Sequence, residues 1–155
     1  MKEILITQGK VALIDDEDYD RVANIKWVAV RNRRIWYAYR WSKGGEKNRH
    51  KIWMHRLIMN TPKGMVVDHI DHDGLNNQKH NLRNCTQKEN KLNSRGSSKT
   101  GYLGVYFCRN TIIAQVYING KNKHIGNFKT VQEAAKSRDK YVSQLRGEFA
   151  NLNFR

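Results

Sequence analysis

The sequence predicts an α+β fold built from three small modules in series. Three observations predict it: strand-like runs dominate residues 1–60, residues 61–95 read strand, long polar loop, strand and helix, and residues 101–155 read three strands followed by one helix. Small and polar residues at 96–100 predict a linker before the last module. A chain of 155 residues is long enough for one ordinary domain or two to three very small ones.

The charge of the chain favours a polyanionic partner. Lys and Arg number 29 against 14 Asp and Glu, a formal net charge of +15. Neutralising phosphates with such side chains releases condensed counterions, so a basic small protein is typically one that binds nucleic acid. The alternative is a surface that is merely highly charged. Residues 61–95 are the least basic third, with three Asp within six residues, which suits a metal site between two cationic flanks.

Membrane binding and disulfide chemistry are both disfavoured. No apolar run approaches the roughly 18 residues of a spanning helix, and the first twenty residues lack the apolar core of a secretory signal. The two cysteines, Cys85 and Cys108, form no CxxC pair, which argues against a zinc ribbon or a disulfide framework. We therefore expect a cytoplasmic protein, in the host cytoplasm if a phage encodes it, with no membrane contact.

The N-terminal module, residues 1–60, is expected to be β-rich. Gln8 and Gly9 should turn the first pair of strands, and the acidic run at 15–20 suits the N-terminus of a helix. Arg and Asn at 31–34 are the expected tip of a second hairpin. The strands themselves are predicted at 4–6, 11–14, 27–30 and 35–41.

Aromatic and arginine side chains alternate along the second hairpin, and two interpretations stay open. The interleaving could form a face that contacts DNA, or the rings could simply be the core of a small sheet. The residues concerned are Trp27, Trp36, Tyr37, Tyr39 and Trp41 among Arg31, Arg33, Arg34 and Arg40.

The other two modules carry clear helix and hairpin signals. In the central module, strands at 65–70 and 82–86 flank a polar loop, and Thr86 with Glu89 forms the capping box of a short helix. In the last module, Asn119–Gly120 is a two-residue hairpin signal between strands. Thr130 with Glu133 begins its helix, and Gly147 ends it.

The central loop contains the residue types that phosphodiester hydrolysis requires. The reaction needs an activated water, charge stabilisation on the phosphoryl oxygens and help for the leaving oxygen. A neutral imidazole such as that of His69 can take a proton from water, and a hard cation held by oxygen ligands such as Asp68 can supply the rest. Side chains adjacent on a strand point to opposite faces, so these two residues would have different roles.

In this region the sequence resembles the HNH nucleases, specifically the homing-endonuclease branch with Asn at the third motif position. The segments that carry the resemblance lie at 54–59, 66–71, 76–77, 80–83 and 89–90. The resemblance implies a ββα-metal finger over residues 61–95, in which His69 is the general base and Asp68 and Asn90 hold a divalent metal. The expected metal is Mg²⁺, with Mn²⁺ as the alternative. Asn81 would brace the loop and orient His69, and Asn77 would support the same loop.

Several neighbours have competing roles. Asn93 is the alternative metal ligand to Asn90. His72 and His80 are interpreted as loop residues or phosphate contacts, and His55 as a packing residue rather than a DNA contact. Because Asn replaces a helix His of the stricter family pattern, Zn²⁺ is the less expected metal.

The last module resembles the AP2 DNA-binding domain, on segments 101–107, 113–116, 124–128, 130–136 and 147–154. That family lays a three-stranded sheet in the major groove with one helix across its back. Gln can read adenine there, whereas Lys holds phosphate or reads guanine. The resemblance implies DNA contacts from Arg109, Gln115, Tyr117, Lys121 and Lys123.

Together these features predict a metal-dependent endonuclease of the HNH homing type that hydrolyses phosphodiester bonds in double-stranded DNA. It would nick as a monomer or cut both strands as a weak dimer, with no obligate protein partner. One alternative is a sequence-specific DNA-binding regulator with a silent nuclease finger, and another is an RNA-binding protein. The family resemblance fits a phage or bacterial source.

Overall fold

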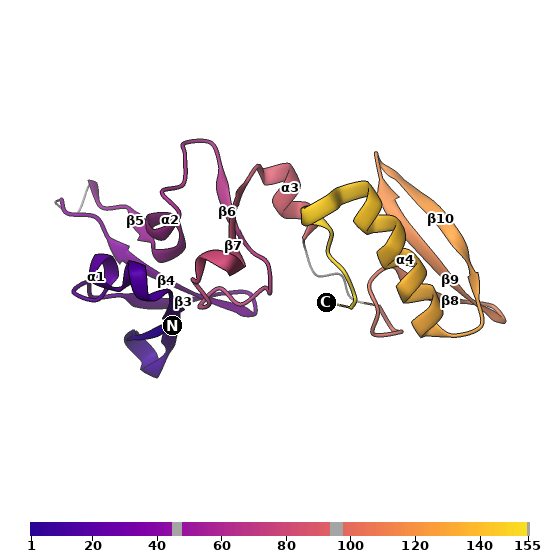
Figure 1. Ribbon diagram of the computed structural model, residues 1–155, viewed down its shortest axis with the longest axis horizontal. Coiled ribbons are helices and arrows are strands. Elements are labelled where there is room, and N and C mark those ends of the chain that lie inside the picture. Colours follow the sequence, from indigo (N-terminus) through magenta and orange to yellow (C-terminus); the bar gives the residue numbers. More distant parts are fainter. Residues whose placement is uncertain (45–47, 94–97, 155) are drawn as a thin grey trace. The chain divides into compact units, whose positions relative to one another are not determined.

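The computed structural model describes residues 1–44, 48–93 and 98–154, which form two compact units, Met1–Asn90 and Lys91–Arg155 (Figure 1). Helices and strands both contribute substantially, so the predicted α+β class is confirmed. The predicted linker at 96–100 lies partly outside the described residues. No helix in the described ranges is long and apolar enough to cross a membrane.

The first unit contains three small antiparallel sheets and short helices. Strands β1 and β2 form one sheet, β3, β4 and β5 the second, and β6 and β7 the third. The bounds are β1 (Lys2–Leu5), β2 (Val11–Ile14), α1 (Tyr19–Val22), β3 (Val28–Asn32), β4 (Ile35–Trp41), β5 (Lys51–Trp53), α2 (Met54–Ile58), β6 (Val66–His69), β7 (Leu82–Cys85) and α3 (Gln87–Leu92), whose last residues belong to the second unit.

The predicted turns form where the sequence places them. Gln8 and Gly9, between β1 and β2, both have a φ of 63°. Arg33 follows β3 with a φ of 55°, which is the left-handed backbone of a tight hairpin. The Thr86–Glu89 capping box is also confirmed, because the Glu89 amide donates to Thr86 Oγ1 (3.2 Å) and the Thr86 amide donates to Glu89 Oε2 (2.8 Å).

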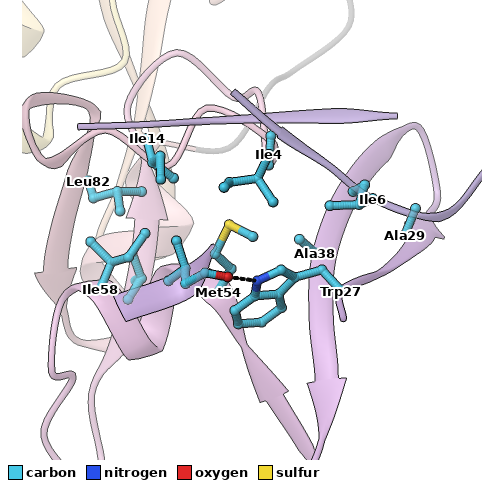
Figure 2. Close-up of a cluster of buried hydrophobic side chains, with 12 residues drawn as sticks. Ile4, Ile6, Ile14, Trp27, Ala29, Ala38, Met54, Ile58 and Leu82 are labelled. Atoms are coloured by element: carbon cyan, nitrogen blue, oxygen red, sulfur yellow. Dashed lines mark hydrogen bonds between the residues drawn. The ribbon is translucent and has the colours of Figure 1, made fainter. Parts of the chain in front are cut away.

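One hydrophobic core serves the whole first unit (Figure 2). Trp27 is its largest side chain, 2% exposed, and its Nε1 donates to the Val22 carbonyl over 2.9 Å. Val67 and Leu82 pack into the same cluster from β6 and β7, so the core spans residues of both the first and the second predicted module. The core interpretation of the aromatic run holds for Trp27, whereas Trp41 is 40% exposed.

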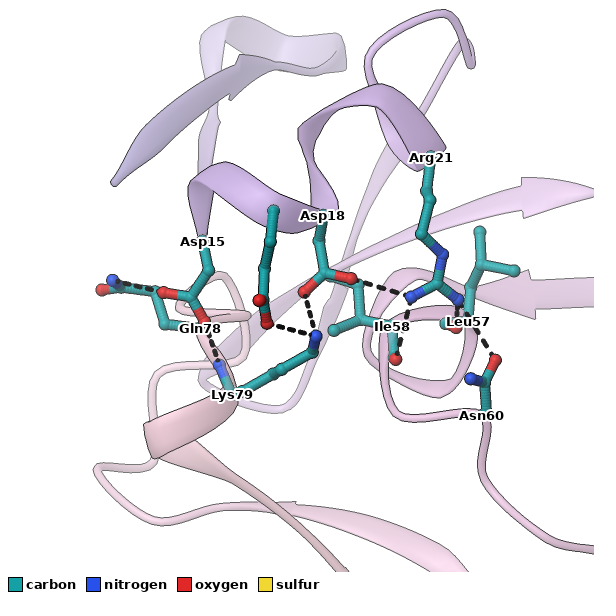
Figure 3. Close-up of polar contacts among 9 residues, drawn as sticks. Asp15, Asp18, Arg21, Leu57, Ile58, Asn60, Gln78 and Lys79 are labelled. Carbon is teal, nitrogen blue, oxygen red and sulfur yellow. Dashed lines mark hydrogen bonds and ion pairs between the residues drawn. The ribbon is translucent and has the colours of Figure 1, made fainter.

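A short helical segment begins at the acidic run, as expected, and these acids also make contacts elsewhere in the chain. Asp16–Asp18 form a single 3₁₀ turn that leads into the four-residue α1. The buried Asp18 carboxylate accepts from Arg21 Nη1 (2.8 Å) and lies 3.1 Å from Lys79 Nζ, while Asp15 Oδ2 accepts from the Lys79 backbone amide (2.7 Å) (Figure 3). Arg21 also donates to the Leu57 carbonyl, so this acidic clamp, Asp15 and Asp18, joins the start of the chain to α2 and to the loop before β7.

The second unit is a three-stranded antiparallel sheet with one helix packed on it. The order is β10 (Lys121–Phe128), β9 (Thr111–Ile118), β8 (Val105–Cys108), and α4 (Val131–Arg146) contacts all three strands. Asn119 and Gly120 turn β9 into β10 with φ values of 47° and 82°, as predicted. The capping box of Thr130 and Glu133 and the terminal Gly147 are confirmed as well.

Buried polar contacts tie the end of the chain to α4. The Asp139 carboxylate accepts from the backbone amides of Asn153 (2.6 Å) and Phe154 (3.0 Å). The Asn153 side chain both donates to and accepts from the backbone of Leu103. The final residues are thereby held against the helix of the second unit and against the segment that precedes its first strand.

Candidate active site

The candidate site lies where β6 and β7 pair. The register sets Asp68 opposite Arg83 and His69 opposite Leu82. Arg83 donates through Nε (2.9 Å) and Nη2 (2.6 Å) to Asp68 Oδ2, and both side chains are buried. A two-donor contact from a planar guanidinium fixes the orientation of the carboxylate as well as its charge.

His69 follows at the end of β6 and is only 6% exposed. Burial lowers the pKa of its imidazole, and the hydrogen bond with Asn77 and the charges of Asp71, Asp68 and Asp73 oppose this effect without reversing it. The ring is therefore neutral at physiological pH, which is the form in which an imidazole can accept a proton.

Asn77 determines which nitrogen of His69 carries the proton. Its Nδ2 donates to the Leu75 carbonyl (3.0 Å), which directs Oδ1 toward His69 Nε2 at 3.4 Å. A carbonyl oxygen can only accept, so Nε2 is the protonated nitrogen and Nδ1 holds the lone pair. The Asn77 amide in turn donates to the Leu13 carbonyl (2.7 Å) of β2, which anchors this residue to the first sheet.

The loop between β6 and β7 is held together by Asn81. Its Nδ2 donates to Asp71 Oδ1 and to the Asn76 carbonyl, both at 2.9 Å, while its Oδ1 accepts from the Asp71 amide. The Asn81 carbonyl accepts from the amide of Ile70, the residue after His69. Burial tends to raise the pKa of Asp71, but hydrogen bonds from Asp73, Asn76 and Asn81 outweigh it and lower that pKa.

An aromatic group surrounds His69 on the side of the β3–β4–β5 sheet. The His55 ring lies edge-on to His69, with centroids 5.1 Å apart, and stacks on Trp53 at 5.9 Å. Tyr37 meets both histidines edge-on, at 6.0 Å and 5.8 Å. Burial, with smaller effects of His69 and Arg56, lowers the pKa of His55 to about 3, so this ring is neutral and serves as packing.

Asn90 and Asn93, the two candidates for the second ligand, lie in different units. Asn90 is half-buried in α3, at the end of the unit that contains Asp68 and His69, and its amide donates to the Thr86 carbonyl (3.0 Å). Asn93 is 1% exposed in the second unit, where its carbonyl accepts from Asn151 Nδ2 (3.1 Å). Within the described ranges, no three His, Cys, Asp or Glu side chains gather closely enough to bind a metal by themselves.

The remaining histidines of the loop, His72 and His80, lie in its turns. His72 has a left-handed backbone, with a φ of 67°, and its amide donates to the His69 carbonyl (3.1 Å). His80 is exposed in the 3₁₀ turn before β7.

Comparison with known proteins agrees with this geometry. A family model described as HNH endonuclease matches residues 53–92, which span β5 to α3. An uncharacterized HNH endonuclease of Acanthamoeba polyphaga mimivirus is 33% identical over 135 residues, covering 83% of this chain and 71% of the relative. This chain belongs to the HNH endonuclease family. No solved structure gives a significant match.

The family model ends at residue 92, so it does not test the DNA contacts predicted in the second unit, which stay predictions from the AP2 resemblance. Gln115 and Tyr117 lie on the sheet face opposite to Ala114 and Val116, which are buried under α4. Cross-strand partners share a face, so Asn122, opposite Tyr117, and His124, opposite Gln115, join them.

The three cationic residues predicted to contact DNA do not lie on the same sheet face as Gln115 and Tyr117. Lys121 and Lys123 pair with Ile118 and Val116, which places them on the helix side of the edge strand, although both are exposed. Arg109 lies in the turn between β8 and β9 and has a φ of 51°.

Within this HNH chain, sequence reasoning overlooked three contributors to the site. Arg83 could have been found from the strand register, because it faces Asp68 directly. Tyr37 and the direct contact of Asn77 with His69 had no signal in the sequence, since they depend on how the first sheet and the loop pack.

Proposed function

We propose that this chain is a metal-dependent DNA endonuclease of the homing type, which hydrolyses phosphodiester bonds in double-stranded DNA and uses its second unit for target binding. The observation that carries the proposal is the buried His69 ring, oriented by Asn77, next to the buried Asp68 at the end of β6. This constellation lies within the segment that matches the HNH family.

His69 is the proposed general base. Its Nδ1 takes a proton from the attacking water, and Nε2–H remains bonded to Asn77 Oδ1. Asn81 acts through the loop, because its hydrogen bonds to Asp71, Asn76 and Ile70 keep the backbone beyond His69 in one conformation. Asn77 supports that loop and also orients the base directly.

Asp68 and Asn90 are the proposed holders of the divalent ion. A carboxylate and an amide oxygen are hard donors of the kind that Mg²⁺ or Mn²⁺ accepts, and two such ligands leave room for water and substrate phosphate. The contact with Arg83 keeps Asp68 oriented for this purpose. When bound, the ion would stabilise charge on the phosphoryl and leaving oxygens. The burial of Asn93 against Asn151 supports Asn90 as the ligand.

Cleavage of supercoiled plasmid tests the proposal. With Mg²⁺, the wild-type chain should give relaxed or linear DNA, and with EDTA it should give none. His69→Ala should lower the cleavage rate by about 10²-fold or more, because general-base catalysis contributes that much. Its duplex affinity should stay nearly unchanged, since the base contributes little to binding.

Two results would contradict this assignment. If His69→Ala lost DNA binding and cleavage together, His69 would be a binding or folding residue. If the wild-type chain bound duplex tightly and produced no cut with Mg²⁺ or Mn²⁺, the chain would be a DNA-binding regulator with a silent nuclease finger.

A further inference from the structure

One face of the β3–β4–β5 sheet carries a row of aromatic rings. Tyr37, Tyr39 and Trp41 alternate along β4 and therefore share a face, and the register adds Trp53 and Lys51 from β5, opposite Tyr39 and Trp41. The rings touch in sequence: Trp41 meets Tyr39 edge-on at 5.5 Å, and Tyr39 meets Trp53 at 5.7 Å. The core of the unit uses the other face of this sheet, through Ala29 and Ala38.

The exposed end of the row is cationic. Lys51 Nζ lies 4.5 Å from the centroid of Tyr39 and 5.9 Å from that of Trp41, and the Arg49 guanidinium lies 5.2 Å above the Trp41 ring. Residues 40–53 carry five basic side chains and one acidic one. Trp41, 40% exposed, and the exposed Arg49 and Lys51 are together called the Trp41 platform.

We propose that the Trp41 platform is a binding site for single-stranded DNA, on which an unpaired base stacks against the Trp41 ring. An exposed indole with cations around it offers the two contacts that single strands need, a ring face for the base and positive charge for the phosphate. A paired duplex hides its base faces inside the stack, so it can use the cations but not the ring.

The cations over Trp41 do not block the base. An exposed cation–π contact changes an equilibrium constant only a few-fold, whereas stacking of a base on an aromatic ring contributes on the order of ten- to a hundred-fold. A base therefore displaces Arg49 from the ring. The released guanidinium remains within one side chain's reach of the same nucleotide, where it can hold the phosphate or cover the second face of the base.

The row of aromatic rings sets the direction in which a bound single strand of DNA would run along the sheet. Trp41 and Tyr37 are four residues apart on β4, about 13 Å at the usual rise of a strand. Tyr37 contacts both His55 and His69. A single strand of DNA that stacks on Trp41 and follows this face approaches His69. The proposed binding is separate from the proposed cleavage and does not depend on it.

The test measures binding in EDTA with the full-length chain, so that cleavage plays no part. The probe is a fluorescently labelled oligothymidine of about ten nucleotides, within the range that single-strand sites usually cover. A duplex of equal length serves for comparison. Trp41→Ala should weaken oligothymidine binding about ten-fold or more and change duplex binding by less than about two-fold. Trp41→Phe, which keeps a ring, should restore most of the affinity.

Two comparisons make the outcome decisive. Lys51→Ala should weaken single-strand binding more than Lys26→Ala does, because both remove one exposed positive charge but only Lys51 lies among the rings. The loss in Trp41→Ala should be similar at low and high salt, since stacking releases no counterions. Unchanged oligothymidine binding by Trp41→Ala, or an equal loss for single strand and duplex, would overturn the proposal. The unfolding midpoint of each variant establishes that the chain is still folded.

Discussion

At the scale of single residues, the chemistry of the site depends on one amide. Asn77 is 1% exposed and is held by hydrogen bonds to Leu75 and Leu13, so its Oδ1 has little freedom. That oxygen fixes the tautomer of His69 and leaves Nδ1 as the basic nitrogen. A loop residue thus controls the protonation pattern of a strand residue.

Replacing Asn77 should therefore impair catalysis more than binding. Without the acceptor, His69 is free to protonate on either nitrogen and to rotate, so Asn77→Ala should lower kcat about ten- to a hundred-fold with little change in KM. The measurement is steady-state nicking of plasmid. Gln78→Ala is the matched control, because Gln78 anchors the same loop to Asp15 (3.1 Å) without a contact to His69. Equal losses in both variants would mean that Asn77 acts only through loop stability.

The spacing of the HNH motif is enough to name Asp68, His69, Asn81 and Asn90 as candidate site residues, because the motif is defined by residue types at set distances in the sequence. The contacts among these residues cannot be predicted from that spacing. The bond between Asn77 and His69 depends on the path of the loop at residues 70–81, which is hydrogen-bonded to β2, and the position of His55 depends on how α2 packs. These are long-range features, and local pattern carries no information about them.

His55 should make the first unit sensitive to acid. Its pKa is about 3 in the folded chain against 6.5 ordinarily, so below pH 6.5 the unfolded chain binds a proton that the folded chain does not. Its stabilising contribution is complete above pH 6.5 and is lost as the pH falls toward 3. In His55→Phe the unfolded chain no longer takes up this proton. The slope of the unfolding free energy against pH should therefore fall by up to about 1.4 kcal/mol per pH unit.

Urea unfolding at a series of pH values between 7 and about 4 measures this slope. His50→Phe is the control, because the exposed His50 ring is in water in both states. An identical slope for wild type and His55→Phe would show that His55 is charged or accessible in the folded chain.

At the scale of elements, the acidic clamp shows what local patterns leave out. A run of carboxylates before an apolar stretch predicts a helix N-terminus, and a short helical segment does begin at Asp16. Asp18 also binds Arg21 and Lys79, and Arg21 donates to the Leu57 carbonyl in α2 (Figure 3). Lys79 is far along the chain, so only the folded structure shows why these acids are present.

Asp18 should accordingly matter for stability. Asp18→Asn removes the charge from a side chain that is 1% exposed and deprives Arg21 and Lys79 of the negative charge that they share, which should cost about 2 kcal/mol of unfolding free energy. Asp20→Asn, at an exposed position of the same segment, is the control and should change stability by less than about 0.5 kcal/mol. Equal effects of the two substitutions in urea titrations would reduce the clamp to a surface contact.

At the scale of the whole molecule, the candidate active site lies in the first unit, whereas more than half of the net positive charge lies in the second unit. Residues 91–155 carry twelve basic and three acidic side chains, a net charge of +9, whereas residues 1–90 have a net charge of +6. The second unit also has a sheet face opposite to α4, with Gln115 and Tyr117 in register with His124 and Asn122. The three strands and the helix form where the sequence predicts them, while the AP2 likeness and its DNA contacts stay predictions.

The register separates two kinds of DNA contact in that unit. Lys121 and Lys123 lie on the helix side of the edge strand, where they suit phosphates, and Gln115 lies on the open face, where it suits a base edge. Replacing both lysines by Ala should therefore lower the slope of log affinity against log salt by about two, for every duplex alike. Gln115→Ala should keep the slope and lose about ten-fold in discrimination between duplexes.

Titrations at several salt concentrations measure both effects, with one duplex selected by the wild-type chain from a random pool and one scrambled duplex of the same composition. The two variants serve as controls for each other, because one changes charge without touching the open face and the other changes the face without touching charge. If Gln115→Ala weakened both duplexes equally, the open face would not read sequence. Discrimination would then have to come from the first unit, whose β3–β4–β5 sheet carries the other exposed set of aromatic and cationic side chains.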